Sequence, residues 1–217
     1  MNLPTKITFS RIIATIILII ALFVMSFLDF ESPILGNTGI NLVFLLVFVF
    51  FVIASFTDYL DGHLARKNNQ VTDLGKFLDP VADKLLINST VIFLIAPSIF
   101  AKYATGQIIT FNMWCAMLLI VRDIVVDALR FIAAQKKVVI AANIFGKMKT
   151  VFEMIAIGAV LLNGFPFNYF DASWPMGLHI ADFLVYIATA MSLISGVIYV
   201  YQNRQVFLTE EKKDDSK

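Results

Sequence analysis

Charged residues are scarce in this sequence, and their scarcity limits the environment in which the chain can fold. Only 15% of its 217 residues are Asp, Glu, Lys or Arg, whereas 59% are hydrophobic and the mean hydropathy is +0.82. A water-soluble domain of this length needs a larger polar fraction to cover its surface. These values exclude an ordinary soluble fold and indicate a protein whose solvent is the lipid bilayer.

Cysteine is nearly absent, and a cleavable leader is not evident. The single cysteine, Cys115, lies in an apolar run, so no intrachain disulfide can form and a buried small residue is expected. The first residues place Pro4 and several polar side chains before an apolar run that no obvious small-residue cleavage site follows. We therefore interpret residues 12–27 as part of a retained membrane span.

Long apolar runs take the place of the missing charge. A bilayer core of about 30 Å requires about 20 apolar residues for each helix. Six stretches meet this requirement: Thr8–Leu28, Ile40–Leu60, Phe77–Ile99, Ile108–Ala134, Gly146–Leu162 and Ile180–Tyr201. The sequence thus predicts an all-α integral membrane fold over residues 1–207, followed by a charged cytoplasmic tail over residues 208–217.

Basic residues are distributed unevenly between the two faces that this arrangement defines. Six spans place both termini on one side, and most Lys and Arg residues fall on that same side. They are Lys6, Arg11, Arg66, Lys67, Lys76, Lys84, Lys136, Lys137, Lys147, Lys149, Arg204, Lys212, Lys213 and Lys217, whereas only Lys102 falls on the other face. Positive residues mark the cytoplasmic side, so both termini are predicted to be cytoplasmic.

Four aspartates lie between the second and third predicted spans, on the cytoplasmic side. Asp58 and Asp61 are three residues apart, and Asp79 and Asp83 are four apart, so each pair shares one face of its helix. Four carboxylates gathered in a hairpin repel one another unless a cation lies among them. Oxygen ligands favour a hard ion such as Mg²⁺ or Mn²⁺, and two divalent ions would balance the four charges.

The residues around these aspartates form a longer pattern, D-x2-D-G-x2-A-R-x8-G-x3-D-x3-D, which extends from Asp58 to Asp83. Eight fixed identities at usages of about 5–7% recur by chance on the order of once in 10⁹–10¹⁰ starting points. With every position filled, the chain resembles the CDP-alcohol phosphatidyltransferase family. This resemblance implies a bundle of six transmembrane helices, a homodimer, and a short interfacial helix at the N-terminus, here Met1–Lys6.

The resemblance also implies a reaction and a role for each motif residue. The family transfers a phosphatidyl group from a CDP-linked lipid to an alcohol and releases CMP. Asp58, Asp61, Asp79 and Asp83 would bind two divalent ions, Mg²⁺ or Mn²⁺, and Asp83 would also be the general base. Contacts with the CDP-lipid would come from Gly62, Ala65, Arg66, Thr72 and Gly75, although Thr72 is equally well explained as a turn cap.

Further charges lie where a membrane makes charge unfavourable. The fourth span contains Arg122, Asp123, Asp127 and Arg130, and such residues usually face the interior of a bundle. An internal ion pair between Asp127 and Arg130 is the alternative interpretation. Lys147 and Lys149 open the fifth span, where they could simply follow the positive-inside rule.

These charges share the cytoplasmic side with the aspartates and predict an anion pocket. Arg11, Arg122, Lys147 and Lys149, with Thr8, would bind the phosphate of an acceptor alcohol and repel choline or ethanolamine. The stretches Asn2–Arg11, Arg122–Arg130 and Gly146–Thr150 resemble the phosphatidylglycerolphosphate synthase branch of the family. This resemblance implies CDP-diacylglycerol as donor and sn-glycerol 3-phosphate as acceptor, at the cytoplasmic face of a bacterial cell membrane. Asp127 replaces an expected small residue.

Two alternatives remain from the sequence. The same chemistry could use another acceptor, such as phosphatidylglycerol, inositol phosphate or serine. A divalent-cation transporter is the alternative from another class, but its ion site should lie near the bilayer midplane, whereas these aspartates lie at span ends beside Arg66. Besides its substrates and membrane lipids, the chain is expected to bind a second copy of itself and no nucleic acid.

Overall fold

The computed structural model describes residues 2–28, 32–36, 38–67, 72–95, 108–136, 144–171, 174 and 178–208. Within the helices, the side chains of residues 3, 61, 63–66, 73, 76 and 205–208 lie outside this description. Among the described residues the secondary structure is helical, apart from an isolated antiparallel bridge between Ile34 and Asn41. The predicted charged tail is not among the described residues.

Six long helices and one short helix make up the described part of the chain. They are α1 (Leu3–Phe27), α2 (Leu42–Lys67), α3 (Asp73–Ile95), α4 (Met113–Gln135), α5 (Ile144–Leu161), α6 (Asn168–Asp171) and α7 (Ile180–Leu208). A helix satisfies its backbone hydrogen bonds internally, which is why long apolar runs fold this way in a bilayer. Local signals set the helix starts: Pro4 lies in the first turn of α1, and Asn112 caps α4 by accepting from Trp114 and Cys115.

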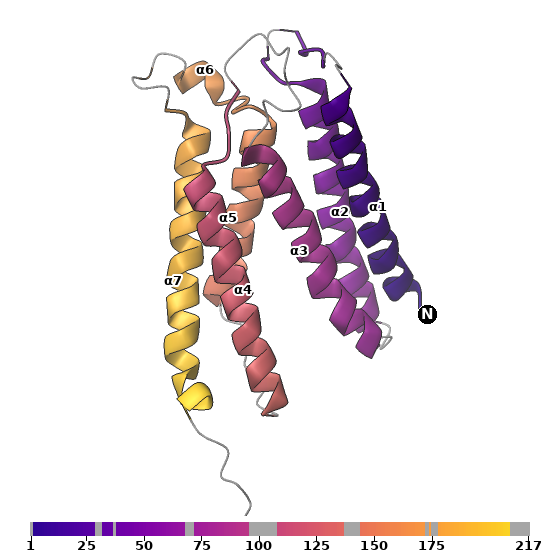
Figure 1. Ribbon diagram of the computed structural model, residues 1–217, viewed down its shortest axis with the longest axis vertical. Helices are drawn as coiled ribbons and strands as arrows, with labels where there is room; N and C mark the ends of the chain where they lie inside the picture. The colour runs from indigo at the N-terminus through magenta and orange to yellow at the C-terminus, as the bar shows by residue number, and fades with distance from the viewer. Residues whose placement is uncertain are drawn as a thin grey trace, which may run out of the picture.

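The long helices form two groups of three. α1 packs on α2 and α3, whereas α7 packs extensively on α4 and α5 (Figure 1). α5 joins the groups because it also contacts α2 and α3. The start of α1 and the end of α7 lie at the same end of the bundle (Figure 1). This is the arrangement expected for an even number of passes.

Three helices are long and apolar enough to cross a membrane by length and composition. These candidate spans cover Pro4–Phe27 in α1, Leu42–Leu60 in α2 and Ile180–Arg204 in α7. The other three long helices, α3, α4 and α5, carry Asp79, Asp83 and the interior charges, which lower their hydropathy. The membrane assignment is therefore supported, and the count of six spans stays a prediction.

The start of the chain differs from the prediction. A separate interfacial helix over Met1–Lys6 was expected, but the described residues from Leu3 onward form the first turns of one continuous helix, α1. Pro4 favours this outcome because a proline in the first helical turn loses no hydrogen bond. The polar start of the chain thus extends α1 toward the aspartates, where Thr5, Thr8 and Arg11 are buried.

The interior of the bundle is apolar at one end and charged at the other. Phe44, Leu94 and Phe111 belong to the buried apolar core. Near the opposite end, Lys149 and Glu153 are buried, with exposed fractions of 5% and 1%. Because burial of a charge is costly unless it is paired, this end is where function is expected.

Candidate active site

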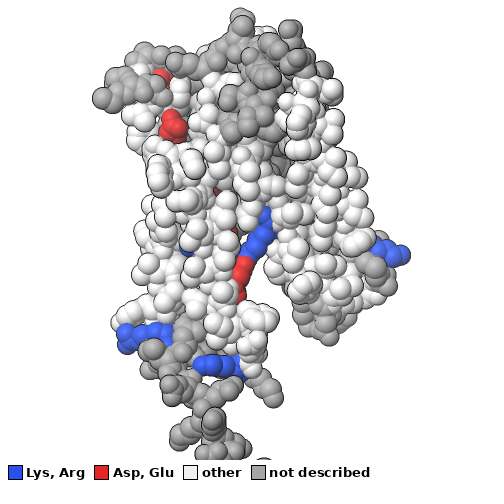
Figure 2. Space-filling view, viewed as in Figure 1, with Lys and Arg blue, Asp and Glu red and all other residues white. Residues whose placement is uncertain are grey.

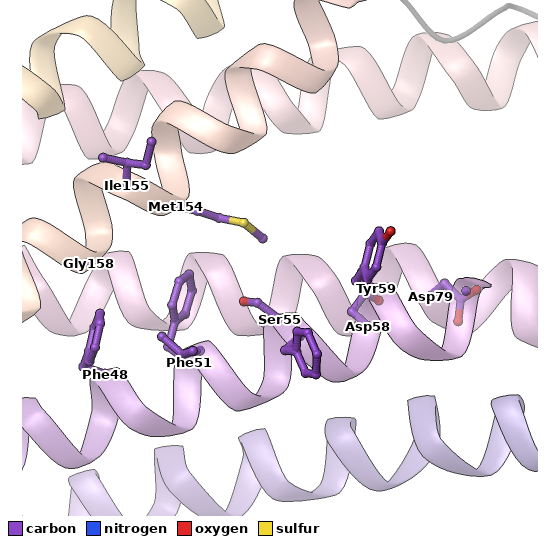
Figure 3. Close-up of a pocket in the computed structure, with 12 residues that line it drawn as sticks. Phe48, Phe51, Ser55, Asp58, Tyr59, Asp79, Met154, Ile155 and Gly158 are labelled. Carbon is purple, nitrogen blue, oxygen red and sulfur yellow. The ribbon is translucent and has the colours of Figure 1, made fainter. Parts of the chain in front are cut away.

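Asp58 and Asp79 lie at one end of a cavity between α2 and α5. The cavity has a volume of about 830 Å³. Its lining residues are Phe48, Phe51, Val52, Ser55, Phe56, Asp58, Tyr59, Gly62, Asp79, Met154, Ile155 and Gly158. Figure 3 shows Phe48 and Gly158 toward one end and Asp58, Tyr59 and Asp79 toward the other. We refer to this cavity as the α2–α5 groove.

The α2–α5 groove therefore has two chemically different ends. Aromatic and aliphatic side chains such as Phe51 and Ile155 line most of it, and the carboxylates of Asp58 and Asp79 lie at one end. Gly158 keeps the groove open, because a Cβ there would lie 3.3 Å from the ring of Phe48. A groove of this kind fits an amphiphile with apolar chains and a polar head.

Polar side chains from α1 hold both of these aspartates. Thr8 Oγ1 donates a 2.9 Å hydrogen bond to Asp79 Oδ1, and Arg11 Nη1 forms an ion pair with Asp58 Oδ1. Arg11 is buried, and its Nε and Nη2 have no hydrogen-bond partner in the described part of the chain. Thr8 and Arg11 thus lie with the aspartates, whereas we had placed them with the acceptor phosphate.

A second, smaller cavity lies between α3, α4 and α5 and is strongly charged. Its volume is about 230 Å³. It is lined by Asp83, Lys84, Arg122, Asp123, Val126, Asp127, Arg130, Gly146, Lys147, Lys149 and Thr150. In the space-filling view, basic and acidic side chains meet in a hollow between the two groups of helices (Figure 2). We refer to this cavity as the charged pocket.

A partly buried network of charges forms one wall of the charged pocket. Lys149 Nζ lies 2.9 and 2.7 Å from the two carboxylate oxygens of Asp123 and 2.7 Å from Glu153 Oε2. Arg122 Nη1 donates to Asp123 Oδ1 at 2.9 Å. Lys149 is therefore held between a carboxylate of α4 and one of α5, and Arg122 shares Asp123 with it. Such mutual pairing is what allows charges to persist away from water.

Three further charged residues of the pocket contact neighbouring helices. Lys84 of α3 forms an ion pair with Asp127 of α4, which joins the two groups of helices beside Asp83. The guanidinium of Arg130 lies over the ring of Tyr199, 5.5 Å from its centroid. Asp127 is thus paired with α3, whereas the sequence alone had suggested Arg130 as its partner.

Of the other motif residues, Gly62 lies in the groove, whereas Thr72 and Gly75 form the start of α3. Gly62 lines the α2–α5 groove, beside Asp58. Thr72 caps the start of α3, because its Oγ1 accepts from the N–H of Gly75 at 3.0 Å and contacts Thr5 Oγ1 at 3.0 Å. A Cβ at Gly75 would lie 3.1 Å from that Thr72 oxygen, so the glycine allows this close approach. The side chains of Asp61, Ala65 and Arg66 lie outside the described residues.

The donor set suits a hard divalent cation, but the described side chains do not by themselves complete a site. Asp58 and Asp79 contribute carboxylate oxygens to one cavity wall, and the buried guanidinium of Arg11 already lies there as a cation. Among the residues whose placement is described, no three acidic, His or Cys side chains come close enough to hold a metal ion. Asp61, the fourth aspartate of the motif, is outside that set.

Several residues at the site were not identified from the sequence. Glu153 is one, although its position four residues after Lys149 inside an apolar run was a usable signal. Ser192, Ser195 and Gly196 of α7 are others, because they contact Arg122 from about 70 positions away in the chain. No local pattern marks residues that act across such a separation.

Comparison with known proteins decides the family. The model of the CDP-alcohol phosphatidyltransferase family matches residues 1–197. The chain belongs to the CDP-alcohol phosphatidyltransferase family. The resemblance inferred from the motif is thereby confirmed, and members of this family generally depend on divalent metal ions.

Three named relatives show which members of the family this CDP-alcohol phosphatidyltransferase is similar to. A Bacillus subtilis protein is 36% identical over 208 residues, which cover 96% of this chain and 98% of the relative. A Mycoplasma pneumoniae protein is 35% identical, with 93% and 87% covered, and a Rickettsia bellii protein is 30% identical, with 95% and 97% covered. All three bear the name CDP-diacylglycerol–glycerol-3-phosphate 3-phosphatidyltransferase.

Proposed function

We propose that this enzyme transfers the phosphatidyl group of CDP-diacylglycerol to sn-glycerol 3-phosphate, giving phosphatidylglycerol phosphate and CMP. The observation that carries the proposal is the position of two aspartates on α3. Asp79 lines the α2–α5 groove, whereas Asp83, one helical turn later, lines the charged pocket. A lipid donor and an anionic acceptor would thus approach the same turn of α3 from two sides.

The α2–α5 groove is the proposed donor site. Its apolar length accommodates acyl chains, and its acidic end lies beside Gly62, where the absence of a side chain lets a diphosphate approach the backbone. Ala65 and Arg66 continue α2 beyond Gly62, and Arg66 is proposed to contact phosphate oxygens. Thr72 and Gly75 support this end of the site by capping α3.

The four aspartates Asp58, Asp61, Asp79 and Asp83 are the proposed ligands of two divalent ions, Mg²⁺ or Mn²⁺. Oxygen donors of this kind suit such ions. Members of the family generally depend on divalent metal ions, which agrees with this ligand set. When bound, the ions would supply positive charge against the diphosphate and the departing CMP. Thr8 and Arg11 hold Asp79 and Asp58 in place, which is the role we now propose for both residues.

The charged pocket is the proposed acceptor site. Arg122, Lys147 and Lys149 line it and supply the cations that a dianionic phosphate needs. Asp83 lines the same pocket and is the proposed general base. The acceptor hydroxyl loses its proton to Asp83, its oxygen bonds to the phosphatidyl phosphorus, and the bond from that phosphorus to CMP breaks with its electrons leaving on CMP.

The proposed topology has six spans with both termini and the site in the cytoplasm, within a homodimer. The described basic side chains seen in Figure 2 lie mainly toward the end where α1 begins and α7 ends. In a variant with Cys115 replaced by Ala, an impermeant thiol reagent should label Cys introduced at Tyr169 in intact cells, but not Cys introduced at Gln135. The reverse labelling would overturn the topology. A protein mass in detergent equal to that of a single protomer would contradict the dimer.

The reaction is tested with the purified enzyme in detergent. CDP-diacylglycerol is supplied with a panel of acceptors, and CMP release is measured with each acceptor in turn. Release that depends on sn-glycerol 3-phosphate is the expected result. Equal or better use of phosphatidylglycerol, inositol phosphate or serine would refute the proposed acceptor while leaving the family assignment intact.

A further inference from the structure

Arg122 is held by a second helix as well as by its own. Its Nε donates to the backbone carbonyl of Ser192 at 3.1 Å, and its Nη2 donates to Ser195 Oγ at 2.9 Å. Both partners are buried on α7, with exposed fractions of 0% for Ser192 and 2% for Ser195. They are three residues apart and so lie on one face of α7, toward α4.

The third element of this arrangement is Gly196. A Cβ at this position would lie 3.1 Å from Arg122 Cγ and 3.2 Å from Arg122 Nε. Both distances are shorter than ordinary van der Waals contact, so any larger residue would push the arginine outward by a few tenths of an ångström. The glycine therefore gives the stem of Arg122 room to lie against α7.

These contacts leave a defined part of the guanidinium available. An arginine side chain has five N–H donors, and among the described residues three of those of Arg122 are used, by Ser192, Ser195 and Asp123. Nε has one N–H and is fully used, whereas Nη1 and Nη2 each retain one. Two N–H groups on adjacent nitrogens are what a fork-like contact with a phosphate requires.

We propose that Ser192, Ser195 and Gly196 form a seat on α7 that positions Arg122 to bind the phosphate of the acceptor. The proposal rests on the function proposed above and deepens it by adding specificity-determining residues from the last helix. A free arginine loses much side-chain entropy when it binds a ligand, and a seated arginine has already lost it. The seat thereby favours an acceptor with a phosphate over a neutral alcohol.

The test is a set of steady-state measurements on the full-length enzyme in detergent. Ser195→Ala removes one hydrogen bond from the seat, and Gly196→Ala fills the space beside the arginine. Thr189→Val is the matched control on α7, because within the described residues the Thr189 hydroxyl bonds only the carbonyl of Val185 in its own helix, at 2.8 Å. For each variant the KM for sn-glycerol 3-phosphate, the KM for CDP-diacylglycerol and the melting temperature are measured.

The seat predicts a rise in acceptor KM for both variants. The rise should be roughly tenfold, at the low end of what a hydrogen bond to a charged group contributes. The KM for the donor and all constants of Thr189→Val should stay unchanged. A donor KM that rises as much as the acceptor KM, or acceptor KM values unchanged in both variants, would overturn the seat. If Ser195→Ala does not fold, Gly196→Ala still decides the matter.

A double-mutant cycle separates positioning from a general packing effect. In an Arg122→Lys background there is no guanidinium to seat, so adding Ser195→Ala should leave the acceptor KM unchanged. A loss as large as in the wild-type background would show that Ser195 acts independently of Arg122 and would overturn the seat. Failure of the wild-type enzyme to use glycerol 3-phosphate would instead refute the proposed function on which the seat rests.

Discussion

Thr8 on α1 donates a 2.9 Å hydrogen bond to the carboxylate of Asp79 on α3. The two residues are 71 positions apart, and the bond fixes one of the motif aspartates from outside its own helical hairpin. Together with the ion pair between Arg11 and Asp58, it makes α1 part of the site. The start of the chain thus supports both helices that carry the aspartates.

Removal of this bond should slow the enzyme without unfolding it. Thr8→Val keeps the shape of the side chain but loses the hydroxyl, and kcat should fall roughly tenfold, since a hydrogen bond to a charged group contributes about 1.5–3 kcal/mol. Ser10→Ala is the control, because the Ser10 hydroxyl is exposed and, in the part of the chain that the structure describes, bonds only the carbonyl of Ile7. CMP release by the two variants gives the comparison, and equal rates would argue against a supporting role for Thr8.

Asp58 and Asp79 should be essential for turnover because they are proposed ligands of a metal ion. EDTA should abolish CMP release, and added Mg²⁺ or Mn²⁺ should restore it. Asp58→Asn and Asp79→Asn should abolish turnover while the protein still inserts in the membrane, because an amide is a much weaker ligand for a hard cation. Mn²⁺ binding to each purified variant gives a second measurement. Near-normal turnover of either variant at saturating metal would contradict the proposed ligand set.

Asp83 should affect the chemical step more than donor binding. A positioned carboxylate base typically contributes about 10²–10⁴-fold, so Asp83→Asn should lose at least about 100-fold in kcat. Its KM for CDP-diacylglycerol should stay near that of the wild type, because Asp83 lines the charged pocket rather than the α2–α5 groove. A comparable loss of donor affinity would indicate that Asp83 acts first as a metal ligand.

The cations of the charged pocket should control acceptor affinity to different extents. Arg122→Lys should raise the KM for sn-glycerol 3-phosphate by about 10–150-fold, since lysine cannot reproduce a two-point contact with phosphate. Lys147→Ala should have a smaller effect because Lys147 is exposed and its charge is screened. Arg204→Lys, at a residue stacked on Tyr201 outside the pocket, is the control. An unchanged acceptor KM in Arg122→Lys would contradict the assignment.

Lys149 should contribute to stability as well as to binding. Lys149→Met would leave the buried carboxylate of Glu153 without its cation and the half-buried Asp123 with Arg122 alone, and breaking a buried pair typically costs about 3–5 kcal/mol. Glu153→Gln should cost less, because Lys149 keeps Asp123 as a partner. Melting temperatures of the two variants in detergent test this order. A larger loss in Glu153→Gln would be inconsistent with the network.

Local sequence patterns were sufficient to predict several features of this protein. The apolar runs predicted the six long helices, since a helix forms from the composition of its own segment. The motif predicted the family and the separation of Asp79 and Asp83 by one turn of α3. These features depend on residues a few positions apart, where helical geometry alone decides the result. Met1–Lys6 was wrongly predicted to form a separate interfacial helix. Polar residues near the start of the chain do not by themselves interrupt a helix, and α1 is continuous from Leu3.

Only the tertiary structure decided which helices meet at the site. The sequence placed Thr8 and Arg11 with the acceptor phosphate, but the packing of α1 on α3 brings them to Asp79 and Asp58. Asp127 pairs with Lys84 rather than within its own helix, and Ser195 reaches Arg122 from α7. The physical reason is that contacts between helices depend on how each helix rotates and packs against its neighbours. This depends on the fit of all buried side chains together, which no short segment of the sequence contains.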